Sequence, residues 1–144
     1  VVNGNHVTIY GLFNEHFQGY QTLWKGEHGR TYFYQSEIPY HPPSVEVWND
    51  EGKQGYASYK VANKVKNHEA FGLGIYSFFS GESTVLNKVR LENAMEVPNN
   101  SGIEILHIST FAGLNGGINH AINGLGPSTE VGELKHFDGI EGRE

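Results

Sequence analysis

Short strand-like runs recur along this chain at long, nearly even intervals, and this spacing restricts the possible folds more than any other feature. Runs of β-branched and aromatic residues begin near Val7, Thr31 and Tyr56, at intervals of 24 and 25 residues. Later runs are spaced less regularly, and they begin near Leu73, Ile103 and Ile118. Several short strands in each repeat, with Gly or Asn at the corners, are typical of the stacked coils of a parallel β-helix.

The composition supports β-structure but leaves a second architecture open. The 144 residues include 19 Gly and 13 Asn, which supply the left-handed backbone of tight turns. Charged residues make up 18%, a low share for a helical protein. A sandwich or barrel of hairpins is the competing interpretation. Asn-Gly pairs, which are typical of two-residue hairpin turns, begin at Asn3, Asn115 and Asn123.

The chain has the length of one domain with a sizeable core. We expect residues 1–126 to form the coils of a β-helix, interrupted at 39–55 by an insertion loop with three prolines. Such loops on a rigid scaffold commonly carry function. Residues 127–144 are polar and rich in Glu, and we expect a peripheral tail. Because the first residues already have the pattern strand, turn, strand, we also expect the chain to be processed or part of a longer protein.

Composition and motifs exclude several functions. The absence of cysteine excludes disulfides, a thiolate nucleophile and Cys-based metal sites. With 10 basic and 16 acidic side chains and no Lys/Arg cluster, a nucleic-acid partner is not expected. No apolar run approaches the roughly 20 residues that cross a bilayer. The eight histidines include no HExxH pair, so we expect neither a metal nor another cofactor.

Two glutamates could carry chemistry. Glu15 and Glu37 are 22 residues apart, and each ends a strand-like run. In a β-helix with coils of that length, the two residues stack at the inter-strand spacing of about 4.8 Å. Carboxylates so close repel each other when both are ionised, so one is expected to keep a proton. Such a pair supplies the acid and the base of glycoside hydrolysis, although the pattern alone fits solvated strand-end glutamates better.

The residues around these glutamates resemble a known family. The stretch YGLFNEHFQGYQTLWKGEHGRTYFYQSEIPYHPP, residues 10–43, is similar to a segment of glycoside hydrolase family 55, the β-1,3-glucanases called laminarinases. The stretch GYASYKVANKVKNHEAFGLGIYSFF, residues 55–79, resembles its continuation, and the similarity extends to about residue 123. It implies a secreted enzyme of two tandem right-handed parallel β-helices with a groove between them. It further implies cleavage of β-1,3-glucan, usually from the chain end, with inversion.

The resemblance also implies roles for individual residues. Glu37, in QSEIPY, would be the general acid, and Glu15, in EHFQ, would be associated with the attacking water. His41 stands where the family pattern has Asp. The chain corresponds to the C-terminal part of the second β-helix, so its expected partners are β-1,3-glucan and the missing N-terminal portion of the same enzyme.

Sugar-binding grooves combine aromatic platforms with hydrogen-bonding side chains. The candidate platforms are Trp24, Tyr40 and Trp48, with core packing as the alternative role. The candidate hydrogen-bonding residues are His16, Gln18 and Gln35. The neighbouring aromatic residues Tyr32, Phe33 and Tyr34 are expected to be structural, because alternate strand residues face opposite ways.

Two alternatives to hydrolysis belong to other functional classes. A β-helix of this kind could be a non-catalytic polysaccharide-binding or structural module, which would bind glucan without turnover. A polysaccharide lyase would need acidic calcium-binding clusters and a basic residue for proton abstraction, and the sequence contains no such cluster.

Overall fold

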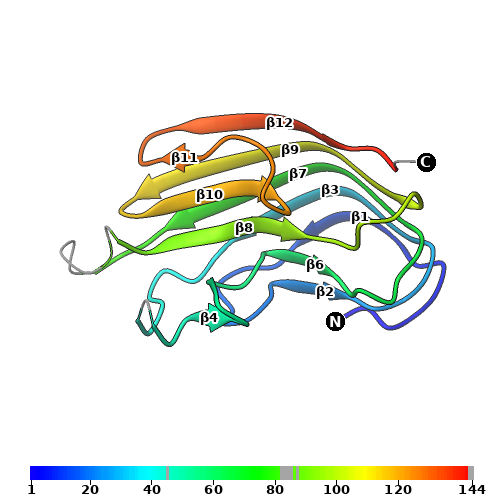
Figure 1. The fold of residues 1–144 in the computed structure, drawn as a ribbon, viewed down its shortest axis with the longest axis horizontal. Helices are drawn as coiled ribbons and strands as arrows, with labels where there is room; N and C mark the ends of the chain where they lie inside the picture. The colour runs from blue at the N-terminus through cyan, green and yellow to red at the C-terminus, as the bar shows by residue number, and fades with distance from the viewer. Residues whose placement is uncertain (45, 82–85, 87, 143–144) are drawn as a thin grey trace.

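The computed structural model describes residues 1–44, 46–81, 86 and 88–142, and every element with described bounds in these ranges is a β-strand. The predicted all-β class is therefore confirmed. Within the same ranges, no helix has the length and apolar character needed to cross a membrane. Figure 1 shows the strands as two layers that curve along each other.

Each layer is a five-stranded sheet. We call one the long-strand sheet; its strands, in spatial order, are β1 (Thr8–Phe13), β3 (Gly29–Glu37), β7 (His68–Phe78), β9 (Ile103–Leu114) and β12 (Leu134–Ile140). The other is the short-strand sheet; its strands, in spatial order, are β11 (Thr129–Glu130), β10 (Gly117–Ile122), β8 (Arg90–Glu96), β6 (Tyr59–Val61) and β2 (Thr22–Trp24). A separate hairpin contains β4 (Asn49–Asp50) and β5 (Lys53–Gln54).

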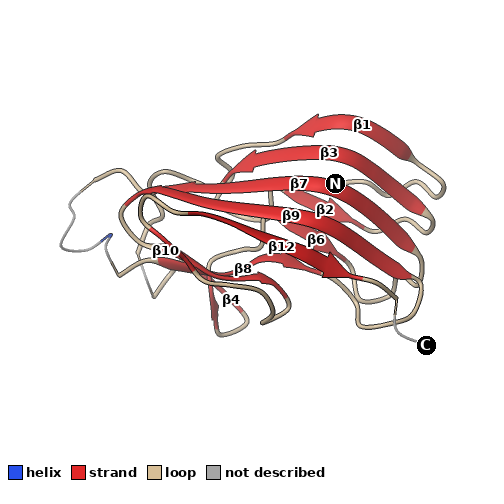
Figure 2. Ribbon diagram, turned by 90° about the horizontal axis from the view of Figure 1, so that it is seen from above, coloured by secondary structure: helices blue, strands red, loops and turns tan. Residues whose placement is uncertain are grey.

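The chain passes alternately through the two sheets, and from β1 to β10 all neighbours within these sheets are parallel. Each passage through both sheets forms one coil, and successive coils stack (Figure 2). This arrangement is consistent with a β-helix and contradicts a fold of hairpins for this part of the chain. The Asn115-Gly116 turn, for example, connects strands of different sheets and is a corner of the coil.

The coils are less regular than the sequence intervals indicate. The register joins Thr8 to Arg30, Arg30 to Glu69, and Glu69 to Glu104, so equivalent residues are 22, 39 and 35 positions apart. The first interval was predicted nearly correctly. The second was wrong, because the run near Tyr56 leads into β6 of the other sheet and the insertion loop lengthens this coil.

Residues 127–144, expected to form a peripheral tail, contribute strands to the edges of both sheets. In the described part of this segment, β11 pairs with β10 and β12 pairs with β9, in both cases antiparallel. The register of β12 runs from Leu134 opposite Phe111 to Ile140 opposite Ile105.

The core fills the space between the sheets with apolar and aromatic side chains. The largest of them are fully buried, and they include Trp24, Trp48, Tyr34, Tyr59 and Phe79. A short polar chain also lies here, because the Tyr59 hydroxyl is 2.7 Å both from Thr31 Oγ1 and from His68 Nε2. The other ring nitrogen of His68, Nδ1, is buried without a hydrogen-bond partner among the described residues.

The buried imidazole makes stability depend on pH. Burial lowers the pKa of His68 from 6.5 to about 4. Between these values the unfolded chain binds a proton that the folded protein does not, so the stability present above pH 6.5 is lost as the pH falls towards 4. We expect the free energy of unfolding to decrease by up to about 3 kcal/mol over this range through His68 alone. Urea unfolding at pH 7, 5.5 and 4 measures it.

The variant His68→Gln isolates this contribution, because an amide can still bond to Tyr59 but does not titrate. We expect a shallower loss of stability with falling pH than in the unmodified protein. His107→Gln, which removes an exposed histidine, should keep the original slope. An unchanged slope in His68→Gln would contradict the assignment.

Candidate active site

The pairing of β1 with β3 brings the two predicted glutamates together. Phe13 lies opposite Gln35, so Glu15 and Glu37, two residues further on, occupy equivalent positions of adjacent coils. The pairing continues past the strand end, where the His16 N–H donates to the Glu37 carbonyl at 3.0 Å. One carboxylate oxygen of Glu15 lies within 4.8 Å of one of Glu37. The 22-residue separation thus has the geometric consequence expected of it.

Two side chains hold one oxygen of Glu37. The Tyr40 hydroxyl donates to Oε2 through a short hydrogen bond, and His16 Nε2 lies 3.1 Å from the same atom. The rings of His16 and Tyr40 also touch, with centroids 4.3 Å apart. The hydrogen bond to Glu37, with a smaller effect of burial, raises the pKa of Tyr40, so the phenol remains a donor at neutral pH. Both contacts leave Oε1 of Glu37 free to meet a substrate.

The backbone turns sharply where these groups meet. His16 has a φ of 64°, in the left-handed region that is uncommon for residues other than Gly, Asn and Asp. Such conformations concentrate at functional sites, where the surrounding structure enforces them. Here the turn follows directly on Glu15 and accompanies the contact of His16 with Glu37.

The spacing of the two carboxylates limits the chemistry in this conformation. Inverting hydrolases hold their carboxyl groups roughly 6.5–9.5 Å apart and retaining ones about 5–5.5 Å apart. Nearest oxygens within 4.8 Å are closer than the inverting arrangement requires. However, Glu15 is exposed and its side chain makes no hydrogen bond to the described residues, so rotation of Glu15 can lengthen the distance.

The same cluster offers a possible set of metal ligands. Glu15, His16 and Glu37 each present one ligand atom, and these atoms lie within 4.8 Å of one another. Two of the residues are exposed and Glu37 is half-exposed. Oxygen and imidazole ligands suit several divalent cations, but nothing else around the cluster singles out a metal.

The insertion loop is tied to the segment that carries Glu15. Gln18 Nε2 donates to the His41 carbonyl at 3.1 Å, and Trp48 Nε1 donates to the Gln18 carbonyl at 3.0 Å. The Tyr20 hydroxyl donates to Asp50 at 2.6 Å. The loop expected to carry function therefore lies beside the glutamates. Gln18, predicted to bind substrate, uses one of its amide protons within the protein.

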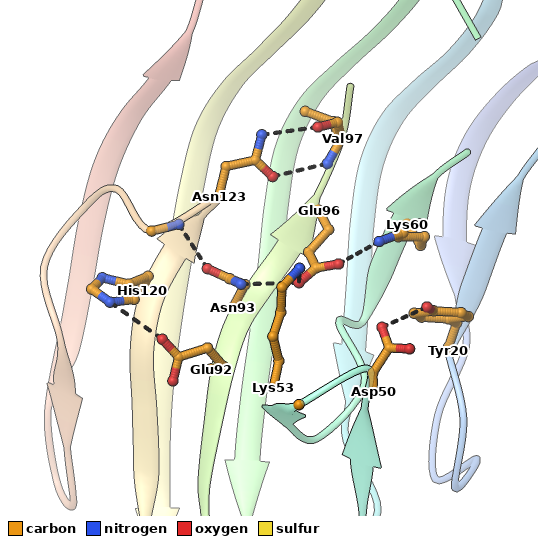
Figure 3. A network of polar contacts seen from close by, with 12 residues as sticks. Tyr20, Asp50, Lys53, Lys60, Glu92, Asn93, Glu96, Val97, His120 and Asn123 are labelled. Atoms are coloured by element: carbon orange, nitrogen blue, oxygen red, sulfur yellow. Dashed lines mark hydrogen bonds and ion pairs between the residues drawn. The ribbon is translucent and has the colours of Figure 1, made fainter. Parts of the chain in front are cut away.

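A buried carboxylate anchors the loop from its other side (Figure 3). Glu96 of β8 is 6% exposed; it accepts hydrogen bonds from Lys53 of the loop at 2.8 Å, from Lys60 through a shorter bond, and from Asn93 at 3.0 Å. Burial alone would raise the pKa of Glu96, but the bonds from the two lysines outweigh it and lower the pKa. The paired charges offset the cost of burial and clamp the hairpin on the short-strand sheet.

The structure corrects two of the predicted sugar platforms. Trp24 is 0% exposed, and its ring packs against His68 and Tyr59 at centroid distances of 4.7 and 6.4 Å. Trp48 is 1% exposed and contacts Phe79 at 5.8 Å. Neither ring can stack on a sugar, because both belong to the core. Of the predicted platforms, Tyr40 alone is partly exposed.

The remaining predicted residue, Gln35, lies half-buried on β3, two positions before Glu37. Sequence reasoning missed two of its neighbours. Tyr76 lies opposite Glu37 on β7. Phe33, expected to be structural, is 59% exposed. Its φ of 63° breaks the alternation of the strand, and the sequence signal for it, glycines at equivalent positions of neighbouring coils, is readable only once the register is known.

Comparisons with known proteins agree with this geometry. The family described as the LAM55 pectate lyase-like domain has a model that matches residues 1–37, the segment with both glutamates. A protein of Streptomyces sp. (strain SirexAA-E / ActE) named exo-β-1,3-glucanase is 35% identical over 129 residues, or 89% of this chain and 21% of its own length.

Solved structures give the same result. The structure of sacteLam55A from Streptomyces sp. SirexAA-E is 30% identical with a TM-score of 0.89, and covers 96% of this chain and 25% of its own. A variant of that protein in complex with glucose is 31% identical, with a TM-score of 0.90 and the same coverage.

Fold and site therefore define a stacked-coil protein of the pectate lyase-like class with a carboxylate pair at its surface. More particularly, the chain is a relative of the family 55 glycoside hydrolases, which confirms the resemblance seen in the sequence. The chain spans about a fifth to a quarter of the length of the relatives it matches.

Proposed function

We propose that this chain forms the C-terminal coils of a right-handed parallel β-helix and carries the catalytic carboxylates of a secreted β-1,3-glucan hydrolase. The observation that carries the proposal is the placement of Glu15 and Glu37 at equivalent positions of adjacent coils, with oxygens within 4.8 Å. The name of the Streptomyces relative supports the substrate and an exo mode of action. Secretion rests on the family resemblance alone.

In the proposed reaction, Glu37 is the general acid. Because Tyr40 donates to Oε2, the transferable proton sits on Oε1, from which it passes to the glycosidic oxygen as the bond to the anomeric carbon breaks. A water adds to that carbon, and its proton passes to Glu15. Inversion requires Glu15 to rotate away from Glu37 and make room for the water between its carboxylate and the sugar.

The partner in this proposal is the remainder of the same enzyme. Relatives are four to five times longer than the chain, since it covers 21–25% of their length. The N-terminal portion would supply the opposite wall of the groove. β1, the first strand of the long-strand sheet, presents an edge to which preceding coils could add.

The test is product analysis with the intact protein that contains these residues. Incubation with laminarin should release glucose as the first product, and proton NMR of the fresh product should show the α-anomer. Initial release of the β-anomer would establish retention, and longer oligosaccharides would establish endo action. Binding of laminarin without any product would favour the non-catalytic module.

A further inference from the structure

A groove lies on the outer face of the long-strand sheet, beside the candidate acid. Its volume is about 280 Å³. Three neighbouring strands and the edge strand β12 provide its side chains, which include Phe33, Gln35, Tyr76, His107, Ser109 and His136. None of the lining residues carries a carboxylate, an ammonium or a guanidinium group. The groove is therefore suited to a neutral ligand.

Two glycines of β7 form the floor of this groove. Gly72 and Gly74 both line it. A Cβ at Gly72 would meet no atom within 4 Å, so the space above this residue is open. A Cβ at Gly74 would lie 2.6 Å from the Tyr76 hydroxyl. Tyr76 therefore lies back over Gly74, along its own strand.

The walls come from the strands on either side of β7. The register places Phe33 of β3 and His107 of β9 level with Gly72. All three have left-handed backbones, with φ of 63°, 60° and 71°, and Gly11 continues the row on β1 with 71°. A left-handed backbone costs roughly 1–2 kcal/mol for a residue with a side chain. The fold accepts that cost where Phe33 and His107 flank the bare floor.

The groove is continuous with the candidate active site. Glu37 lies opposite Tyr76, and Gln35 lies opposite Gly74. Residues two apart on a strand are about 6.6 Å apart and point to the same face. The groove thus begins one row of side chains away from the carboxylates.

We propose that this groove binds a glucosyl unit of β-1,3-glucan next to the bond that is cleaved, an inference that rests on the proposed function. Phe33, which is 59% exposed, presents an aromatic face to the apolar C–H face of a sugar ring. Gln35, Ser109 and His136 supply hydrogen-bonding groups for hydroxyls. Ser109 Oγ and His136 Nδ1 lie 3.4 Å apart, so both present polar atoms at the same point.

The test compares substrates of different length in the intact protein. Phe33→Asn removes the aromatic face but keeps a residue that tolerates a left-handed backbone. We expect kcat/KM for laminarihexaose to fall about tenfold, mainly through KM, and kcat/KM for an aryl β-glucoside, which has a single glucosyl unit, to stay within twofold. Tyr10→Asn, an equally aromatic and exposed residue of the same sheet outside the groove, should leave both substrates unaffected.

Equal effects of Phe33→Asn on both substrates, or no effect on either, would overturn the groove assignment while glucan hydrolysis stands. A second measurement separates the two proposals. In the Glu37→Gln background, NMR titration with laminarihexaose should shift resonances of His107 and His136, and Phe33→Asn should weaken this binding. Binding of this kind in a protein that hydrolyses no glucan would retain the groove and remove the hydrolase.

Discussion

Replacing Glu37 by Gln is expected to lower kcat on laminarin by about 10³-fold and to leave KM within a few-fold. The amide keeps the size of the side chain and can still accept the hydrogen bond of Tyr40, but it has no proton to give to the leaving oxygen. General acid catalysis contributes typically 10²–10⁴-fold. Steady-state release of glucose by the intact protein measures the change.

The leaving group shows whether the lost function is proton donation. An aryl β-glucoside with an acidic phenol departs without protonation, so kcat for this substrate should fall much less than kcat for laminarin. Glu104→Gln is the matched control, because Glu104 is also a half-exposed strand glutamate but lies on β9 opposite Glu69, at the far end of the strands. The control should retain full activity.

Equal losses on both substrates would mean that Glu37 does not donate the proton. A loss confined to KM would make it a binding residue. Circular dichroism and thermal unfolding of Glu37→Gln should match those of the unmodified protein, because the side chain is at the surface and removes no packing.

The carboxylate pair could be anticipated because its two members lie in one uninterrupted coil. Nothing is inserted between β1 and β3 beyond one short strand and its corners, so the separation of Glu15 from Glu37 equals the coil step of 22 residues. The next steps, of 39 and 35 residues, include a loop whose length no period encodes. Sequence intervals therefore located the site but not the later coils.

Side-chain burial at the corners could not be inferred in the same way. Trp24 stands in a three-residue strand, too short for alternation to show which side faces the core. Trp48 lies on an insertion loop, and its burial depends on how the loop folds back over the sheets. The left-handed backbone at Phe33 likewise depends on neighbours that the coil brings together from distant parts of the chain.

Trp24→Ala is expected to lower the free energy of unfolding by about 3–5 kcal/mol, the range for truncating a large buried aromatic side chain. The indole is fully buried between the sheets and contacts Tyr59 and His68. Gly29 lies directly against it, since a Cβ there would be 2.1 Å from the indole nitrogen. Urea unfolding of the variant and of the unmodified protein measures the difference.

This result separates a core residue from a sugar platform. A platform would lose affinity for glucan with little change in stability, whereas Trp24→Ala should lose stability and retain KM wherever it remains folded. Trp24→Phe, which refills part of the space, should recover part of the loss. Phe17→Ala removes an aromatic ring that is 58% exposed, and surface substitutions of this kind usually change stability by less than about 0.5 kcal/mol. A stable Trp24→Ala variant with weakened glucan binding would return this residue to the substrate groove and contradict the packing described here.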